Sequence, residues 1–227
     1  MGKNSDSLNA KVHAFCQNKV SQPVGKTKTC WDLPQAALEA AGAKTSYDYQ
    51  EITGKSDQDY IWGKPINILK IQKGDILQFR NHLIKFNYET SGKMIFPDGS
   101  SVTYTYPYTR SQTRPHHSAV VSSNNGKGIV VVFEQHVRTP GKKKDTVQKN
   151  RIYISDHKTS QKGTPITKSY NLQSKGDINK LIKMFGHKAI QDIKKDYKKG
   201  KITLKEEKRS FKVKVSGNIW AYRPEPK

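Results

Sequence analysis

One cysteine in this chain lies where a nucleophile could be activated. Cys30 precedes an alanine- and leucine-rich run, Gln35 to Ala41, which predicts a helix beginning near Thr29. A helix N-terminus presents unpaired N–H groups and positive partial charge, which favour the thiolate form of a nearby cysteine. Cys30 is therefore a candidate nucleophile. Cys16, beside Phe15 within another expected helix, is a candidate core residue.

Two adjacent histidines begin a predicted strand. His116 and His117 precede Ser118-Ala119-Val120-Val121, and alternation along a strand directs only one of the two rings toward the helix side. His117 is favoured as the general base, because the small residues after it allow the cysteine helix to approach closely. A zinc site that combines both histidines with Cys30 or His136 is disfavoured, because the usual metal-ligand spacing is absent.

The next predicted strand ends in two polar residues. Glu134 and His136 are two positions apart and should share a strand face. Either side chain could bond the far ring nitrogen of His117 and fix its tautomer, so the third catalytic role is divided between them. An alternative is that Glu134 is exposed and pairs with a lysine. Gln22 is a candidate oxyanion donor, together with the Cys30 N–H.

The rest of the chain predicts an α+β fold. Helices are expected at residues 12–20, 29–41, 178–185 and 190–197, the second of them ending at Gly42 with Leu33, Ala37, Ala40 and Ala41 on one face. Strands are expected at 76–80, 83–88, 102–108, 117–122, 128–133, 151–154 and 219–222. Turns are expected at 91–93, 97–99 and the Asn-Gly pair 125–126. We therefore expect a nucleophile helix packed on an antiparallel sheet.

Four segments, taken in order, resemble a known superfamily. They are Thr29-Cys30-Trp31-Asp32-Leu33, Lys73-Gly74-Asp75-Ile76-Leu77-Gln78-Phe79, His117-Ser118-Ala119-Val120-Val121 and Val132-Phe133-Glu134-Gln135-His136. Together they resemble the papain-like NlpC-type and CHAP cysteine peptidases and amidases. The resemblance is closer still to the cysteine-proteinase-fold domain at the C-terminus of fungal actin-patch proteins and in uncharacterised bacterial proteins. It covers about residues 20–137 and the last strand near 219–223.

The resemblance implies a papain-like fold with defined roles. Cys30 would be the nucleophile, His117 the general base and Glu134 the group that orients it. His136 stands where CHAP enzymes often have asparagine. No cofactor is expected. We expect one domain over residues 1–227, with its core at about 10–137 plus a terminal strand at 211–223. Residues 138–210 would be a basic helical insertion or extension.

Charge is distributed unevenly along the chain. The net charge is +22, and residues 138–227 contain 25 Lys and Arg against 8 Asp and Glu, which gives +17 and leaves +5 for residues 1–137. Such a surface attracts nucleic acid, anionic polymers or acidic proteins, although it could equally be a solvated lysine-rich face. The candidate polyanion-binding residues lie off the apolar stripe of the helix predicted at 190–197: Lys194, Lys195, Lys198 and Lys199.

Composition leaves two classes of function. No apolar run approaches the ~20 residues of a transmembrane helix, and residues 1–10 lack the apolar stretch of a signal peptide, so a cytoplasmic location is the default expectation. The first class is a cysteine-dependent hydrolase of a peptide or other amide. The second is a non-catalytic papain-like module that binds an acidic partner or polyanion. The reactivity of the Cys30 thiol would distinguish them.

Overall fold

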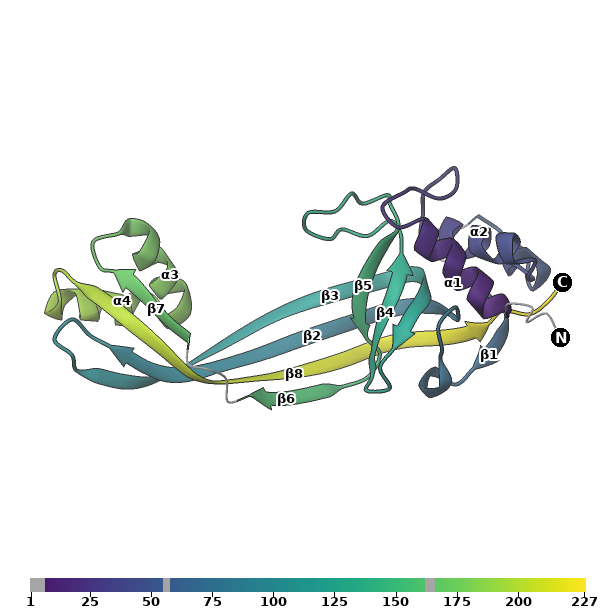
Figure 1. Ribbon diagram of the computed structural model, residues 1–227. Coiled ribbons are helices and arrows are strands. Elements are labelled where there is room, and N and C mark those ends of the chain that lie inside the picture. The colour runs from purple at the N-terminus through teal and green to yellow at the C-terminus, as the bar shows by residue number, and fades with distance from the viewer. Residues whose placement is uncertain (1–6, 55–57, 162–165) are drawn as a thin grey trace, which may run out of the picture. The chain divides into compact units, whose positions relative to one another are not determined.

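The computed structural model describes residues 7–54, 58–161 and 166–227 (Figure 1). It has a mixed α+β structure in which a mostly antiparallel sheet is accompanied by a few helices. The chain divides into two compact units. The first unit comprises Met1–Ile84, Ser111–His157 and Lys214–Lys227, and the second comprises Lys85–Arg110 and Lys158–Val213. In the described part of the chain, no helix is long and apolar enough to cross a membrane.

The sheet follows the order β1-β8-β2-β3-β4-β5. Its strands are β1 (Lys64–Ile66), β2 (Ile76–Ile95), β3 (Ser101–Asn124), β4 (Ile129–Glu134), β5 (Gln148–Tyr153) and β8 (Lys201–Arg223). Strand β4 pairs antiparallel with both β3 and β5, and β1 pairs antiparallel with β8. Two short 3-10 helices, η1 (Ser46–Asp48) and η2 (Ile68–Lys70), lie in the connections.

Helix α1 (Leu8–Asn18) begins four residues before the expected position at Val12. The Ser7 side chain accepts a hydrogen bond from the Ala10 N–H and so satisfies one of the free donors of the first turn. On its inner face Val12 and Cys16 are fully buried. Cys16 is thus confirmed as a core residue.

Helix α2 (Asp32–Ala41) begins three residues later than the Thr29 start that its sequence suggests. Its end is as predicted, because Gly42 adopts the left-handed conformation (φ 72°) that terminates many helices. The expected buried face is correct for Leu33, Ala37 and Ala41, but Ala40 is exposed and Leu38 is buried in its place.

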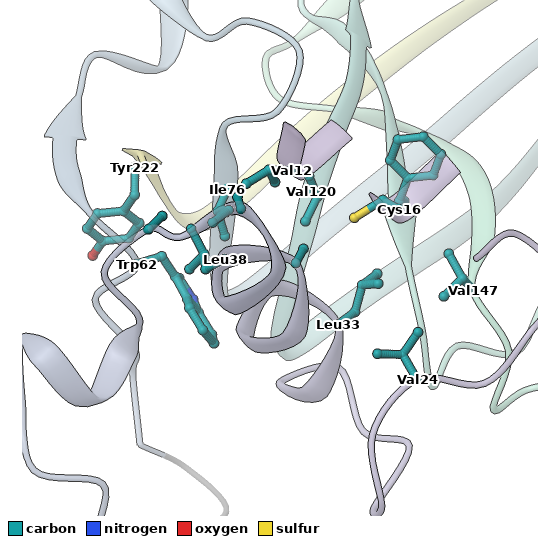
Figure 2. Close-up of a cluster of buried hydrophobic side chains, with 14 residues drawn as sticks. Val12, Cys16, Val24, Leu33, Leu38, Trp62, Ile76, Val120, Val147 and Tyr222 are labelled. Carbon is teal, nitrogen blue, oxygen red and sulfur yellow. The ribbon is translucent and has the colours of Figure 1, made fainter. Parts of the chain in front are cut away.

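Side chains from α1 and α2 pack against the sheet in one cluster (Figure 2). Leu33 and Leu38 of α2 meet Ile76 of β2, Val120 of β3 and Phe133 of β4. Each fully buried leucine contributes about 1.5–3 kcal/mol relative to an exposed one. This packing fixes the N-terminal end of α2, and with it the turn that contains Cys30, against strands β3 and β4.

Strands β2 and β3 are longer than predicted. The expected turn at residues 91–93 is wrong, because these residues lie inside β2. A Cβ atom added at Gly92 would lie 2.0 Å from the Lys205 carbonyl oxygen, so glycine here permits a close approach of β2 to β8. The turn at residues 97–99 and the hairpin that joins β3 to β4 through Asn125 and Gly126 are confirmed.

The second unit has a hydrophobic cluster of its own. Strand β7 (Ile166–Asn171) pairs antiparallel with β8, and β6 (His157–Gln161) also pairs with β8. Figure 1 shows α3 (Lys175–Phe185) and α4 (His187–Asp196) close to β7. The cluster contains Met94, Tyr104, Tyr170, Leu172, Leu181, Ile190, Ile202 and Leu204.

This division differs from the expected single domain with an insertion at 138–210. Residues 85–110 belong with 158–213, because Met94 and Tyr104 bury their side chains against Leu181 and Ile190 of the two helices. Residues 111–157 belong to the first unit, whose sheet includes β4 and β5.

Candidate active site

Cys30 lies in the turn directly before α2, partly exposed. The buried carboxylate of Asp32 holds this turn by accepting hydrogen bonds from the Thr29 N–H at 2.7 Å and the Thr29 hydroxyl at 2.8 Å. Gly25 lies against the same carboxylate, since a Cβ there would come within 2.0 Å of Asp32 Oδ1. The first residue of α2 therefore shapes the loop before the cysteine.

A buried glutamine ties the same loop to the sheet. Gln135 follows β4 directly, and its side-chain amide accepts a hydrogen bond from the Val24 N–H at 2.8 Å. It also donates to the carbonyl oxygens of Val24 at 2.9 Å and Thr29 at 3.1 Å. These three bonds fix the backbone immediately before Cys30 at the end of β4.

His117 of β3 stands between Cys30 and Glu134. Cys30 and His117 line the same cavity and are close enough for each to shift the pKa of the other. The Nε2 atom of His117 lies 3.0 Å from Glu134 Oε2, which leaves Nδ1 as the nitrogen available to the sulfur. The ring of His117 also stacks on Phe79, with centroids 6.3 Å apart. The contact with Glu134 and the stacking on Phe79 together restrict the imidazole to one orientation.

Glu134 is fully buried at the end of β4 and has three partners. Besides His117, it accepts two hydrogen bonds from Arg114, at 2.8 Å to Oε2 and 2.6 Å to Oε1. The Asn150 amide of β5 donates to Oε1 at 2.8 Å. Such a bidentate, charge-assisted arrangement holds the carboxylate in its ionised form.

The electrostatics of the three groups favour charge separation. Burial alone would raise the pKa of Cys30, but the hydrogen bond and charge of His117, with the Ser118 and Cys30 N–H groups, bring it below its usual value. Burial would lower the pKa of His117, yet its bonds to Cys30 and Glu134 raise that pKa to about 9. Burial likewise opposes ionisation of Glu134, but His117 and Arg114 hold the pKa of this carboxyl far below its ordinary value. The surroundings of Cys30 and His117 therefore shift both pKa values toward the charged forms, thiolate and imidazolium.

A cavity of about 390 Å³ opens onto this group. Its wall includes Cys30, His116, His117, His136, Arg114 and Arg138. The size falls within the range of small-ligand sites. A carbonyl group in the cavity could therefore approach the sulfur, while the far side of His117 is sealed by buried Glu134 and Arg114.

The other histidines have different partners. His136 does not share a face with Glu134, because β4 ends at Glu134 and His136 adopts a positive φ of 62°. Its Nδ1 instead lies 2.8 Å from the exposed carboxylate of Asp145. His116 contacts Gln78 at 3.2 Å through Nε2. Both rings line the cavity, but only His117 joins the cysteine to the buried carboxylate.

Gln22 is not brought to the cysteine. It is exposed, its N–H donates to the Lys19 carbonyl at 2.9 Å, and its own carbonyl accepts from the Val147 N–H at 2.9 Å. It does not line the cavity. The Cys30 and Ser118 N–H groups are near enough to the sulfur to lower the pKa of the Cys30 thiol. Within the described ranges, no cluster of three His, Cys, Asp or Glu side chains could hold a metal ion.

Three residues that support the site, Arg114, Asn150 and Gln135, are not indicated by any motif in the sequence. Each supports a predicted residue, and Arg114 also lines the cavity. Each comes from a strand or strand end that tertiary pairing brings close. Asn150 faces Val132 in the β4–β5 register, which places it diagonally to Glu134. Only the polar character of Arg114, three residues before His117 in a strand, was a signal.

The four candidate polyanion-binding lysines are all exposed. Lys194 and Lys195 lie in the last turn of α4, and Lys195 pairs with Asp192 at 3.1 Å. Lys198 and Lys199 are not on the helix, because α4 ends at Asp196. The four charges therefore lie on the helix end and the turn that follows it, rather than on one helix face.

Comparison of the chain with protein-family models, curated proteins and solved structures returns no match.

Proposed function

We propose that this chain is a cysteine-dependent amide hydrolase of papain-like type, with Cys30 as nucleophile and His117 as general acid and base. The observation that supports this most is the order of three groups at the wall of an open cavity: Cys30, then His117, whose charge lowers the pKa of the thiol, then buried Glu134, which lies 3.0 Å from the His117 ring. A cysteine, an imidazole and an orienting third group are the parts that thiol acyl transfer requires.

The first half of the reaction forms a thioester. The Cys30 thiolate attacks the carbonyl carbon of the amide, and the developing oxyanion is stabilised by backbone N–H groups near the sulfur, of which the Cys30 N–H is one. The C–N bond then breaks as the His117 imidazolium gives its proton to the leaving nitrogen. The products are a free amine and an acyl group on the sulfur.

The second half restores the cysteine. Neutral His117 takes a proton from a water molecule, whose oxygen attacks the thioester carbonyl. The C–S bond breaks, a carboxylic acid leaves, and the thiolate and imidazolium are regenerated. Glu134 remains ionised throughout, because Arg114 and Asn150 satisfy its other lone pairs. Its role is to hold the ring and stabilise the imidazolium.

Two linked measurements test this proposal. A library of short acetylated peptides carrying a fluorogenic amide leaving group should include substrates that the protein turns over, and Cys30→Ala should abolish the turnover. An activated acetyl ester should form a thioester at Cys30 that mass spectrometry detects, whereas His117→Ala should form it far more slowly at neutral pH. A protein that hydrolyses no amide and forms no thioester at Cys30 is not such an enzyme.

The second candidate function is binding of a polyanion without catalysis. It is favoured by the +17 charge of residues 138–227 and by the exposure of all four predicted lysines. A non-catalytic module would bind heparin with a steep salt dependence and fail both tests of the thiol. Catalysis and polyanion binding involve different residues, so a variant that removes one function should leave the other measurable.

A further inference from the structure

The second unit contains a cavity of about 470 Å³ whose walls combine tyrosines with cations. All of its lining residues belong to this unit. The tyrosines come from three strands: Tyr88 from β2, Tyr106 and Tyr108 from β3, and Tyr170 from β7. The volume is that of a site for a small organic ligand.

One wall is a stack of aromatic rings. Tyr88 lies 5.8 Å from Phe211 at an interplanar angle of 26° and 5.9 Å from Tyr108 at 34°. Tyr108 is 50% exposed. An exposed ring within an ordered stack offers a face on which a flat ligand can lie, at an energy of about 1–3 kcal/mol for a nucleic-acid base.

Four cations surround the same space: Arg110, Lys168, Lys180 and Arg209. Against them the cavity wall has one carboxylate, that of buried Glu206, which pairs with Lys168 at 3.1 Å and with Arg209. Glu206 thereby fixes two cations at the wall while neutralising only one charge. Lys180 is drawn toward Asp177, at 3.1 Å.

Arg110 is positioned differently from the other three. Its guanidinium carbon lies 4.8 Å from the Phe86 ring centroid and 5.7 Å from that of Tyr88. Within residues 7–54, 58–161 and 166–227, Arg110 forms no ion pair. Its hydrogen-bonding edge is therefore available to an anion, while its stacked face keeps it beside the tyrosines.

A buried hydroxyl in the hydrophobic cluster of the same unit also has no partner among the described residues. Tyr104 precedes Tyr106 and Tyr108 on the same face of β3, and its hydroxyl makes no hydrogen bond among the described residues. Burial is the main reason that its pKa is raised, to about 12, and the charge of Glu206 adds to the effect. Tyr104 itself does not line the cavity, so its hydroxyl is not one of the groups that the ligand would contact.

We propose that this cavity binds a nucleotide, with the base on the tyrosine stack and the phosphate on Arg110 and its neighbouring cations. We expect a flat ring in the ligand because the exposed Tyr108 ring offers it a face to stack on, and negative charge because four cations line the cavity against one carboxylate. A free nucleoside phosphate and one unit of a single strand share this chemistry. The proposal involves no residue of the Cys30 site.

Calorimetric titration of the full chain tests it, with ADP, adenosine, inorganic diphosphate and a short single-stranded oligonucleotide as probes. ADP should bind saturably, and at least about tenfold more tightly than adenosine or diphosphate alone, since each supplies only half of the contacts. An oligonucleotide that binds more tightly than ADP identifies a strand as the ligand source, and the reverse order identifies a free nucleotide.

Variants separate the cavity from general charge. Arg110→Gln and Tyr108→Leu alter exposed side chains and should each weaken ADP binding about tenfold. The control, Lys194→Gln with Lys195→Gln, removes two exposed charges outside the cavity and should change the affinity less than twofold at moderate salt. Absence of saturable binding to both ADP and the oligonucleotide would overturn the proposal. So would equal losses in Arg110→Gln and the control.

Discussion

Replacing Glu134 by glutamine should destabilise the fold far more than removing the charge of an exposed carboxylate would. The substitution keeps the shape but removes the charge that faces Arg114 and His117. Arg114 is 8% exposed, so its guanidinium would remain buried without a counter-charge. Breaking a buried ion pair in this way costs about 3–5 kcal/mol.

The pKa of His117 gives a second estimate of the stability that Glu134→Gln would lose. Its rise from 6.5 to about 9 corresponds to roughly 3 kcal/mol at about 1.4 kcal/mol per pKa unit, shared between Glu134 and Cys30. Because the folded-state pKa is raised, this stabilisation is fully present below pH 6.5 and is lost as the pH rises through about 9. The penalty of Glu134→Gln should therefore be larger at pH 7 than above pH 9.

Urea unfolding at these two pH values measures the effect. The matched control is Asp145→Asn, which removes a carboxylate from an exposed pair with His136 and should cost less than about 1 kcal/mol. In the double variant Arg114→Met with Glu134→Gln the losses should be less than additive, because the buried cation is gone. If Glu134→Gln costs no more than Asp145→Asn, the charge of Glu134 does not stabilise Arg114 and His117.

Three further outcomes are expected. Iodoacetamide should label Cys30 near neutral pH and leave Cys16 almost unlabelled, because burial raises the pKa of Cys16 far above its usual value; equal slow labelling of both peptides in mass spectrometry would contradict this. Gln135→Leu should cost on the order of 3 kcal/mol and slow the alkylation of Cys30, because three backbone groups before the cysteine lose their partners; unchanged stability and labelling rate would show that the loop is held by other contacts. Replacing Lys194, Lys195, Lys198 and Lys199 by alanine should flatten the salt dependence of heparin binding while leaving Cys30 labelling intact; elution of the wild type from heparin at about 0.1 M salt would remove polyanion binding from the account.

The sequence indicates the three central residues of the candidate site. It does not indicate the residues that hold them in place. Cys30, His117 and Glu134 can be picked out because a helix start and two consecutive strands bring such residues together. Arg114, Asn150 and Gln135 depend on strand register and on the path of the loop before Cys30. A polar residue in a strand gives no indication of which buried charge it will meet.

The clearest difference between the predicted and observed strands arises at a glycine. Gly92 within Ser91-Gly92-Lys93 has the local composition of a turn, yet it lies in the middle of β2 where another backbone approaches. Composition alone cannot separate these two uses of glycine, because both need the absence of a Cβ atom. The missed continuity of β2 and β3 in turn concealed the second unit, whose cluster includes Met94 and Tyr104.

The most direct measurement is a pH titration of the ultraviolet absorbance of the Cys30 thiolate, taken as the difference between the wild type and Cys30→Ser. Cys16 does not interfere, because its buried thiol stays protonated over the range of interest. The ion pair with His117 predicts a midpoint below the ordinary thiol value of about 8.5, and a midpoint that moves up in His117→Ala. A wild-type midpoint at or above the ordinary value, unchanged by His117→Ala, would contradict the central claim that these residues form an activated thiol.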